Sequence, residues 1–592
     1  MCEFIEMLEK IKSSSSESVA NKEFSEFNEY MHVPTQVDKE LGDIIKKAAE
    51  YKKALILVCG NSGDGKSHLI SKLVKNGVID ERKFHIYNDA TSSDRKGMHA
   101  NEKLKEILRP FKDGELEDGN TYRLIVAINL GVLNDFLQKN RSEFSVFSSY
   151  IENNNLFDTL PAWKSLKIEK EKKLDREEHY LIAHVDFTEY HRYTLSSEGV
   201  GTEFIHSLLS KIMGQEEKNH IYRNYVQACS ACGTRENCPV YYNYGYLLKN
   251  LKIREYIVSI LIKAIIKHSL TPSVREINDF FYECIVGSTF DSNLNDVKSV
   301  ERLNHFIHNN LFWNLFENIS GLRTYVLKED SLNSTQRSYD QKIVLLNLMP
   351  SFDMWVEGKA SEGNPLFIQI DSNIKYCSNL HVKQYNKLKD EIKRDVFKLY
   401  LRAEAAKTDA EDQDYKSFIK YVFNYNTGNL EECEDLYELV QICFYRWNGR
   451  LNNEYGEDIK DAVVLSKGSD KYCLYKTITL EPEPDYEMDL INLDYTYWKF
   501  STNICLSFRA NGKIDIYSID IDYDLYTFLL NISRGYQPTS VDRRRRVKFD
   551  SFVKDIVSAS NDEIHVYSFL DNGRRYVIKK NFIGKYIFEE ER

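Results

Sequence analysis

One stretch of the chain combines residue types and spacing suited to holding a triphosphate. Residues 60–67 read Gly-Asn-Ser-Gly-Asp-Gly-Lys-Ser, which matches the pattern G-x-x-x-x-G-K-S. Glycines let such a loop turn its backbone N–H groups inward as an anion-binding nest. We expect Lys66 to reach the β- and γ-phosphates and Ser67 to hold Mg²⁺. The full predicted binding set is Gly60, Asn61, Ser62, Gly63, Asp64, Gly65, Lys66, Ser67 and His68.

Hydrolysis of a bound nucleotide also needs a polar group at the end of a neighbouring strand. Three predicted strands end in a suitable residue: 84–88 before Asp89, 124–128 before Asn129, and 181–185 before Asp186. We rank Asp89 and Asp186 equally as the carboxylate that positions metal or water, and we assign Asn129 to orienting the attacking water. The alternative for each is a cap on the following helix. The usual Asp-Glu pair after the third strand is missing.

A candidate arginine follows a predicted helix start at Thr271-Pro272, with Thr as N-cap and Pro in the first position. Arg275 points off the apolar face of this helix, where the helical lid of a ring ATPase supplies an arginine to the γ-phosphate. The alternative is a solvated arginine near a helix N-terminus, a slightly unfavourable place for a cation.

A cysteine cluster is the candidate metal site. Cys229, Cys232 and Cys238 form C-x₂-C-x₅-C, and tight C-x₂-C turns suit tetrahedral Zn²⁺. Only three ligands are local, so His206, His220 or Cys284 would complete the set. The alternative is three reduced structural thiols. We expect a zinc ion here to staple helices rather than to catalyse a reaction.

The densest basic run is Arg543 to Arg546 with Lys548. It predicts either a contact with a nucleic-acid backbone or, slightly favoured, a solvated strand edge or loop kept charged against aggregation. The chain as a whole does not favour nucleic acid, because 79 Lys and Arg stand against 90 Asp and Glu, a formal net charge of −11.

The hydrophobic pattern around the glycine loop predicts the strands and helices that would position these candidate residues. The apolar run 54–59 predicts a buried parallel strand before the glycine loop, and 67–74 predicts a helix after it. Strands alternate with helices to about residue 200, which indicates a parallel sheet with helices on both faces. We expect an α/β chain: a P-loop NTPase with an AAA-like sheet and helical lid, then a helical region and a β-rich C-terminal domain. The predicted domains are 1–50 (N-terminal helices), 51–200 (ATPase core), 201–290 (lid with the cysteine cluster), 291–445 (helical) and 446–592 (β-rich).

Two Asn-Gly pairs, 511–512 and 572–573, each lie between alternating runs and predict β-hairpins. The 592 residues suggest roughly three or four domains. The sequence contains no run of about 18 apolar residues, which a membrane span would need. The first residues do not resemble a signal peptide, and the scattered cysteines suit a reducing compartment. We therefore expect a cytoplasmic protein.

In its motifs and the order of its predicted elements, the chain resembles the DptF (DndF) proteins of bacterial DNA-phosphorothioation-dependent restriction systems. The resemblance covers about residues 50–290. It is carried by Cys-Gly-Asn-Ser-Gly-Asp-Gly-Lys-Ser-His at 59–68, Tyr-Asn-Asp-Ala-Thr at 87–91, Leu-Ile-Val-Ala-Ile-Asn-Leu-Gly-Val-Leu-Asn at 124–134, and the cysteine cluster.

That resemblance implies the ATPase component of a restriction complex, acting with DptG- and DptH-like partners against DNA that lacks the sulfur modification. It carries ATP binding over to Gly60–Ser67 and leaves open a homo-oligomer and direct contact with DNA. Two alternatives remain: a switch or scaffold that binds ATP but scarcely hydrolyses it, which the missing Asp-Glu favours, and a phage-sensing signalling ATPase with no DNA function.

Overall fold

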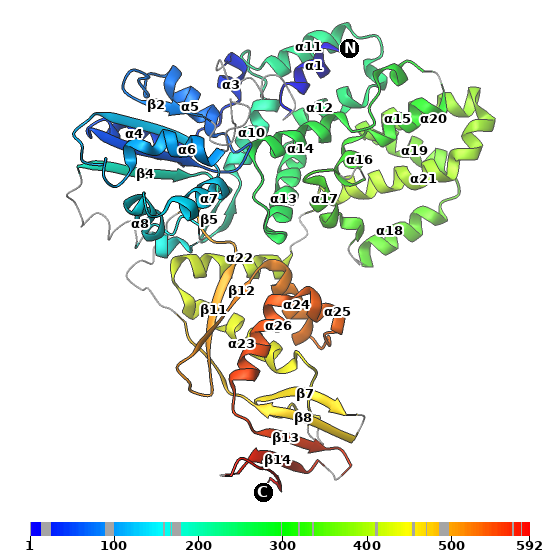
Figure 1. The fold of residues 1–592 in the computed structure, drawn as a ribbon. Helices are drawn as coiled ribbons and strands as arrows, with labels where there is room; N and C mark the ends of the chain where they lie inside the picture. Colours follow the sequence, from blue (N-terminus) through cyan, green and yellow to red (C-terminus); the bar gives the residue numbers. More distant parts are fainter. Residues whose placement is uncertain are drawn as a thin grey trace.

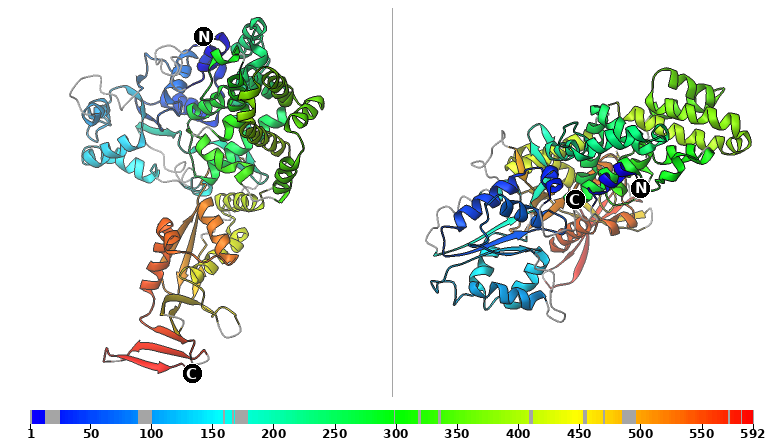
Figure 2. Two further views of the ribbon diagram at one scale, coloured as in Figure 1. Left: turned by 90° about the vertical axis from the view of Figure 1, so that its right-hand side faces the viewer. Right: turned by 90° about the horizontal axis from the view of Figure 1, so that it is seen from above.

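The structure is a computed structural model, in which the chain forms a broad α/β and helical body with an elongated C-terminal part (Figure 1). The N- and C-termini lie at opposite ends of the molecule (Figure 2). The described residues are 2–12, 25–88, 100–157, 160–165, 167, 179–297, 299–317, 320–333, 337–408, 412–452, 456–468, 471–484, 496–570, 573–581 and 583–591.

A four-stranded, all-parallel sheet in the order β2-β3-β1-β4 forms the centre of the N-terminal body. Strand β1 is buried along its whole length, as the apolar run 54–59 predicts for all but its first residue, Lys53. Residues Cys59, Ile128 and Asp186 lie in register at the carboxyl ends of the three adjacent strands. The strands are β1 (Lys53–Cys59), β2 (His85–Tyr87), β3 (Tyr122–Ile128) and β4 (Tyr180–Asp186).

Helices cover both faces of this sheet. Side chains alternate between faces along each strand, so Leu55 and Leu57 pack with one helical layer, and Ala54 and Ile56 pack with the other. The first layer is α6 (Ala100–Leu108), α7 (Leu130–Asn140) and α8 (Ser145–Asn153); the second is α4 (Gln36–Ala48) and α5 (Lys66–Lys75). The predicted two-faced α/β arrangement of the core is confirmed.

A helical region follows the sheet and continues to residue 405. Its core is continuous with that of the short N-terminal helices α1 (Glu3–Glu9) and α3 (Glu26–Met31). The helices are α10 (Glu203–Met213), α11 (His220–Ala231), α12 (Pro239–Lys249), α13 (Leu251–Lys267), α14 (Val274–Val286), α15 (Val300–His308), α16 (Leu311–Phe316), α17 (Arg323–Val326), α18 (Arg337–Leu348), α19 (Phe352–Ser361), α20 (Pro365–Leu380) and α21 (Val382–Ala405).

The C-terminal part mixes antiparallel sheets with helices. One sheet has the order β12-β11-β9 and the other β15-β14-β13-β8-β7. The strands are β7 (Ala462–Gly468), β8 (Tyr472–Thr477), β9 (Leu480–Pro482), β11 (Ile504–Ala510), β12 (Ile516–Ile521), β13 (Ile564–Ser568), β14 (Arg575–Lys580) and β15 (Tyr586–Glu590). The helices are α22 (Gln413–Thr427), α23 (Glu434–Arg446), α24 (Tyr523–Ser533), α25 (Ser540–Arg545) and α26 (Val547–Ala559).

Both predicted hairpins are present. Strands β11 and β12 pair antiparallel around Asn511 and Gly512, whose φ angles of 53° and 64° are those that a tight two-residue hairpin turn requires. Strands β13 and β14 pair around Gly573; Asn572 lies outside the described residues. The predicted boundary at residue 446 falls on the last residue of α23, a helix that packs against β7 and α24. The structure instead groups α22 and α23 with the C-terminal strands.

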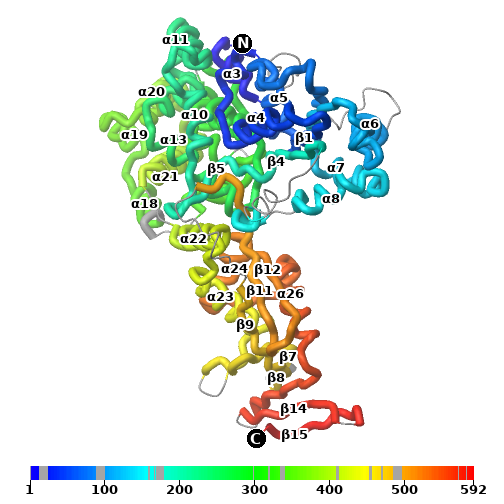
Figure 3. The backbone as a smooth tube through the Cα atoms, turned by 90° about the vertical axis from the view of Figure 1, so that its left-hand side faces the viewer, coloured from blue at the N-terminus to red at the C-terminus, as the bar shows by residue number. Residues whose placement is uncertain are grey.

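One strand of the C-terminal region returns to the N-terminal body. Strand β10 (Tyr497–Lys499) pairs antiparallel with β5 (Tyr190–Ser196), which also pairs with β6 (Gly199–Gly201). Figure 3 shows the orange β10 segment beside β5. The sequence pattern predicts no such pairing, because strands of three residues carry almost no periodicity.

Candidate functional site

The glycine loop joins the end of β1 to the start of α5 at the carboxyl edge of the parallel sheet. Gly60, Gly63 and Gly65 have φ angles of 151°, 90° and 99°, which L side chains rarely adopt. At Gly63 an added Cβ would also lie 3.0 Å from Ser273 Oγ, so the loop packs closely against the start of α14. The conformation and the close packing together explain why glycine occupies these positions.

Lys66 and Ser67 occupy the first turn of α5, beside this loop. The Lys66 ammonium donates to the carbonyl oxygens of Gly60 at 2.9 Å and Asn61 at 2.6 Å. The Ser67 hydroxyl lies 3.5 Å from the carbonyl oxygen of Asn88, at the end of β2. The loop thus places a cation, a hydroxyl and a helix N-terminus together, a combination that attracts anions.

Asp64 stabilises the loop through a hydrogen bond within it and an ion pair with Arg192. Its Oδ2 accepts from the backbone N–H of Asn61 at 2.6 Å, and its Oδ1 lies 3.6 Å from Nη2 of Arg192, a buried residue of β5. Burial raises the pKa of Asp64, while the Arg192 charge opposes that shift. A buried carboxylate and a buried guanidinium therefore compensate one another directly beneath the loop.

The three strand-end candidates have different surroundings. Asn129 lies at the site: its Nδ2 is 3.4 Å from Asn61 Oδ1, and its Oδ1 caps α7 by accepting from the Gly131 N–H at 2.8 Å. Asp186 is buried, and both its oxygens accept from Thr188, at 2.9 Å from the backbone N–H and 2.7 Å from the hydroxyl. These bonds form a local turn before β5 and not a helix cap, whereas Asn129 is the N-cap of α7. Asp89 lies outside the described residues.

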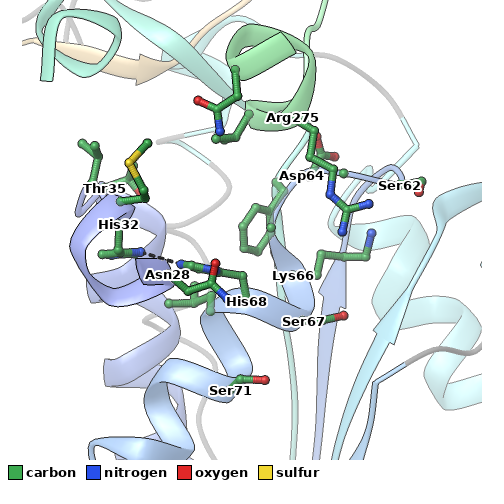
Figure 4. Close-up of a pocket in the computed structure, with 18 of the residues that line it drawn as sticks. Asn28, His32, Thr35, Ser62, Asp64, Lys66, Ser67, His68, Ser71 and Arg275 are labelled. Carbon is green, nitrogen blue, oxygen red and sulfur yellow. Dashed lines mark hydrogen bonds between the residues drawn. The ribbon is translucent and has the colours of Figure 1, made fainter. Parts of the chain in front are cut away.

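Arg275 lies beside the glycine loop and lines the same cavity. An added Cβ on Gly63 would lie 3.4 Å from Arg275 Cδ, and Figure 4 shows the guanidinium group above Lys66. The predicted helix start is shifted by two residues. The N-cap is Ser273, whose hydroxyl and backbone N–H form a capping box with Glu276, and the helix begins at Val274. Ser273 rather than Thr271 is the N-cap because Glu276 lies three residues after Ser273, as a capping box requires.

The cavity, which is partly open to solvent, measures about 470 Å³ and has two chemically different ends. Lys66, Ser67 and Arg275 line a polar end (Figure 4). The rest of the wall is largely contributed by the N-terminal segment and by apolar side chains of the sheet and helices. These residues include Ile11, Phe27, Asn28, Met31, Val33, Thr35, Phe187, Phe204 and Leu208. Such a pocket suits a ligand that carries both an anionic and an apolar, planar part.

A polar network ties the N-terminal segment to α5. His32 Nδ1 lies 3.1 Å from His68 Nε2, and Asp38 Oδ1 lies 2.8 Å from His32 Nε2 and 3.0 Å from Lys72 Nζ. Burial would raise the pKa of Asp38, but hydrogen bonds and charge from His32, Thr35 and Lys72 lower it overall. Burial and the neighbouring His32 lower the pKa of His68 to about 4. His68 is therefore a neutral part of the wall rather than a phosphate-binding cation.

The cysteine cluster lies at the corner between α11 and α12. Cys229 is in the last turn of α11, Cys232 follows that helix, and Cys238 is the N-cap of α12. Among the described residues, no three His, Cys, Asp or Glu side chains are arranged to hold a metal ion.

None of the three residues proposed to complete the cluster lies with it. His220 opens α11, at the opposite end from Cys229. His206 lines a separate cavity with Glu255 and Lys263, and Cys284 is buried in α14 near Arg323. The structure therefore offers no support for His206, His220 or Cys284 as the missing ligand.

The basic run lies on a helix rather than on a strand edge or loop. Helix α25 contains Arg543, Arg544 and Arg545. The Arg546 guanidinium lies 3.7 Å from the centre of the Phe528 ring and bonds Asp524, and Arg543 bonds Asn448. Arg543 and Arg546 thus make local contacts within the C-terminal part, whereas Arg544 and Arg545 are exposed.

Several residues of the site carry no sequence signal. Arg192 lies two residues past the Tyr190 start of β5, the middle strand of a separate three-stranded sheet, and His32 and Asp38 precede the first strand by more than a dozen residues. Only tertiary packing brings them to the loop. The glycine pattern, in contrast, locates the loop itself directly.

Comparison with known proteins identifies no relative. No family model matches the chain, and neither the curated proteins nor the solved structures contain a significant match to it. Within the described part of the chain, no helix has the length and hydrophobicity needed to cross a membrane.

Proposed function

We propose that this chain binds ATP with Mg²⁺ at the 60–67 loop and hydrolyses it. The observation that carries this proposal is the loop itself: it joins a buried parallel strand to a helix, and it brings Lys66 and Ser67 to a cavity that Arg275 closes from the other side. Strand, glycine loop and helix form the context in which G-x-x-x-x-G-K-S binds phosphate.

The residues present fit the substrate and the metal. The Ser67 hydroxyl is a hard oxygen donor of the kind that Mg²⁺ prefers, and the metal would neutralise charge on the β- and γ-phosphates. Lys66 would leave the carbonyls of Gly60 and Asn61 to contact the same phosphates. Asn129 would orient the attacking water, and Arg275 would stabilise the charge that develops on the γ-phosphate. The apolar part of the cavity would take the base.

Titration calorimetry with Mg-ATP tests binding, and steady-state phosphate release tests turnover. Lys66→Ala should weaken binding by at least about 100-fold, because it removes charge-assisted contacts worth about 3 kcal/mol. Phosphate release should disappear with it. Lys75→Ala is the matched control, since Lys75 is exposed on the same helix and pairs with Glu29 at 2.7 Å. Equal heats for the wild type and Lys66→Ala would refute the site.

A slow-turnover switch is the second candidate, and Asp186 favours it. This carboxylate is engaged by Thr188, and β3, next to β2 in the sheet, is followed by a neutral amide, Asn129. In a switch, Mg-ATP would bind with Lys66-dependent heat, while single-turnover hydrolysis would remain slow with and without DNA. Burst kinetics distinguish the ATPase from the switch. An ATPase hydrolyses its first bound ATP at the steady-state rate or faster, whereas the switch would hydrolyse it slowly.

The larger role that we propose is in a bacterial DNA-phosphorothioation-dependent restriction complex, alongside DptG- and DptH-like proteins in the cytoplasm. It rests on the resemblance of residues 50–290 to DptF proteins. Copurification with neighbouring gene products tests it. Direct contact with DNA would involve the exposed Arg544 and Arg545, and Glu at both positions should then abolish salt-dependent DNA binding. A phage-sensing signalling ATPase would show no such binding.

A further inference from the structure

The five-stranded C-terminal sheet ends in an exposed strand, β15, at the tip of the elongated part (Figure 3). Among the described residues, β15 pairs with β14 alone, which leaves its other edge unpaired. Tyr586 and Phe588 of β15 are 63% and 61% exposed, although Phe588 stacks on Tyr576 of β14 at a ring-centre distance of 4.9 Å. A strand edge that carries exposed aromatic side chains is a template for pairing with another strand.

The hydrogen bonds between β14 and β15 show which backbone groups point to the unpaired edge. The Asn581 N–H donates to the Lys585 carbonyl at 2.8 Å, and the Glu591 N–H donates to the Arg575 carbonyl at 2.9 Å. In an antiparallel pair, every second residue of a strand bonds the same neighbour. Odd-numbered residues of β15 therefore direct their backbone groups toward β14, and even-numbered residues direct theirs outward.

The charges of β15 are ordered along the strand. Lys585 immediately precedes it, and Glu589 and Glu590 are its last two residues. A second β15 running parallel would place these carboxylates beside their own counterparts, and like charges on adjacent strands destabilise the pair. A second β15 running antiparallel would place the basic end of one copy opposite the acidic end of the other. The strand is thus complementary to itself in one direction, which makes a second copy of this chain the partner that fits it.

We propose that β15 pairs antiparallel with β15 of a second copy about a two-fold axis at Ile587, which joins the two five-stranded sheets into one. The partly buried Ile587 lies opposite its own counterpart. Tyr586 lies opposite Phe588 of the second copy, and these residues exchange their outward backbone hydrogen bonds. Lys585 lies opposite Glu589 of the second copy.

This register is the one that matches the side chains. Residues directly opposite each other share a face of the sheet, so aromatic side chains meet on one face, and isoleucines and opposite charges meet on the other. Moving the axis by one residue, to Phe588, would place Ile587 opposite the carboxylate of Glu589. The axis at Ile587 avoids that mismatch.

The position of β15 leaves room for the second copy. It lies at the end of the molecule that is farthest from the N-terminal body (Figures 1 and 3). A two-fold axis perpendicular to the sheet at this edge therefore places the two N-terminal bodies at opposite ends of the dimer. One strand pair is a small interface, so we expect a reversible dimer. The inference does not depend on ATP binding, because its test reads the oligomeric state.

Sedimentation velocity of the full chain, with any affinity tag at the N-terminus, measures that state. The wild type should change from monomer to dimer over about 1 to 100 µM, a range suited to a small interface. Lys585→Glu and Glu589→Lys should each dimerise at least about 10-fold more weakly, because each places like charges opposite one another at both ends of the strand pair.

An equimolar mixture of these two variants should dimerise like the wild type, since every charge pair between them is again of opposite sign. Glu591→Lys is the matched control: it makes the same change of charge one residue beyond the end of β15, outside the proposed pairs. It should dimerise like the wild type. A wild type that stays monomeric at every concentration, or that forms species larger than a dimer, would overturn the proposal.

Disulfide trapping tests the register. Ile587→Cys should form a covalent dimer in oxidised glutathione, because opposite residues of a non-hydrogen-bonded pair have Cα atoms about 4.5 Å apart, within the reach of a disulfide. Glu589→Cys should not, since this position lies opposite Lys585 rather than its own counterpart. The wild type gives the background from the native free cysteines. Equal cross-linking of the two variants, or a dimer unaffected by Lys585→Glu, would overturn the pairing at Ile587.

Discussion

The Lys66 ammonium lies against two carbonyls of its own loop, so the triphosphate that we propose would have to draw it away from Gly60 and Asn61. Arg275 approaches the same loop from a different part of the chain. Lys66 belongs to the proposed phosphate-binding loop itself, whereas the position of Arg275 depends on how α14 packs. Substitutions at the two positions should therefore have different kinetic consequences.

We predict that Arg275→Ala lowers kcat for ATP hydrolysis by about 10³-fold or more, the range for an arginine that stabilises transition-state charge. The Kd for Mg-ATP should change by less than about 10-fold, because Lys66 and the loop amides remain. Stopped-flow phosphate release and calorimetry measure the two quantities. Arg275→Lys should recover little, since lysine lacks the bidentate geometry. A large loss of binding with unchanged kcat would contradict this role.

The pKa of His68 leads to a prediction about pH. Its folded value is about 4, below the ordinary value of 6.5. The neutral form is thus favoured by folding, and the stability it contributes is complete above pH 6.5 and is lost as pH falls toward 4. Between about pH 7 and pH 4.5 we expect a loss of about 2 kcal/mol.

Hydrogen exchange of the α5 amides, corrected for the intrinsic rate at each pH, measures this local stability. In His68→Gln the pH-dependent loss over this range should be largely absent, because the titrating group is gone. An equal pH dependence in wild type and variant would show that another group is responsible.

Element geometry explains how distant residues meet at the loop. Parallel strands β1, β3 and β4 end at one edge, so Cys59, Ile128 and Asp186 share a register position and the residues that follow them are neighbours. On the opposite side of the cavity, the first turn of α14 presents Arg275. The capping box of Ser273 sets where that turn begins.

We predict that Ser273→Ala destabilises the chain by about 1 kcal/mol through loss of the N-cap and lowers ATP turnover by displacing Arg275. Thr271→Ala is the control, because Thr271 precedes the cap and should change neither quantity. Thermal unfolding and phosphate release measure the effects. A larger destabilisation by Thr271→Ala would place the helix start at Thr271 instead.

At the scale of the whole molecule, one buried amide joins three distant segments. Asn426 of α22 accepts from the N–H groups of Ala162 at 3.1 Å and Ser501 at 2.8 Å, and it donates to the Ser501 carbonyl at 2.7 Å. With the β10–β5 pairing, it fastens the C-terminal part to the N-terminal body (Figure 3).

We predict that Asn426→Ala costs about 3 kcal/mol or more, because it leaves buried backbone groups without partners. Limited proteolysis should then release a C-terminal fragment more rapidly. Asn424→Ala, on the same helix, is the control, since its amide reaches only Glu432, within the C-terminal part, at 3.4 Å. Equal cleavage rates would show that β10 pairing alone suffices.

The sequence by itself determined the glycine loop with its strand and helix, the strands of the parallel sheet and the two hairpins, because each depends on local periodicity or on turn residues with special φ angles. The tertiary structure decided the rest. It brought Arg192 and His32 to their partners beside the glycine loop, placed Asp186 in a turn, and set the helix cap at Ser273 rather than at Thr271. The physical reason is that these outcomes depend on which segments share a buried surface, and contacts across hundreds of residues leave no local pattern.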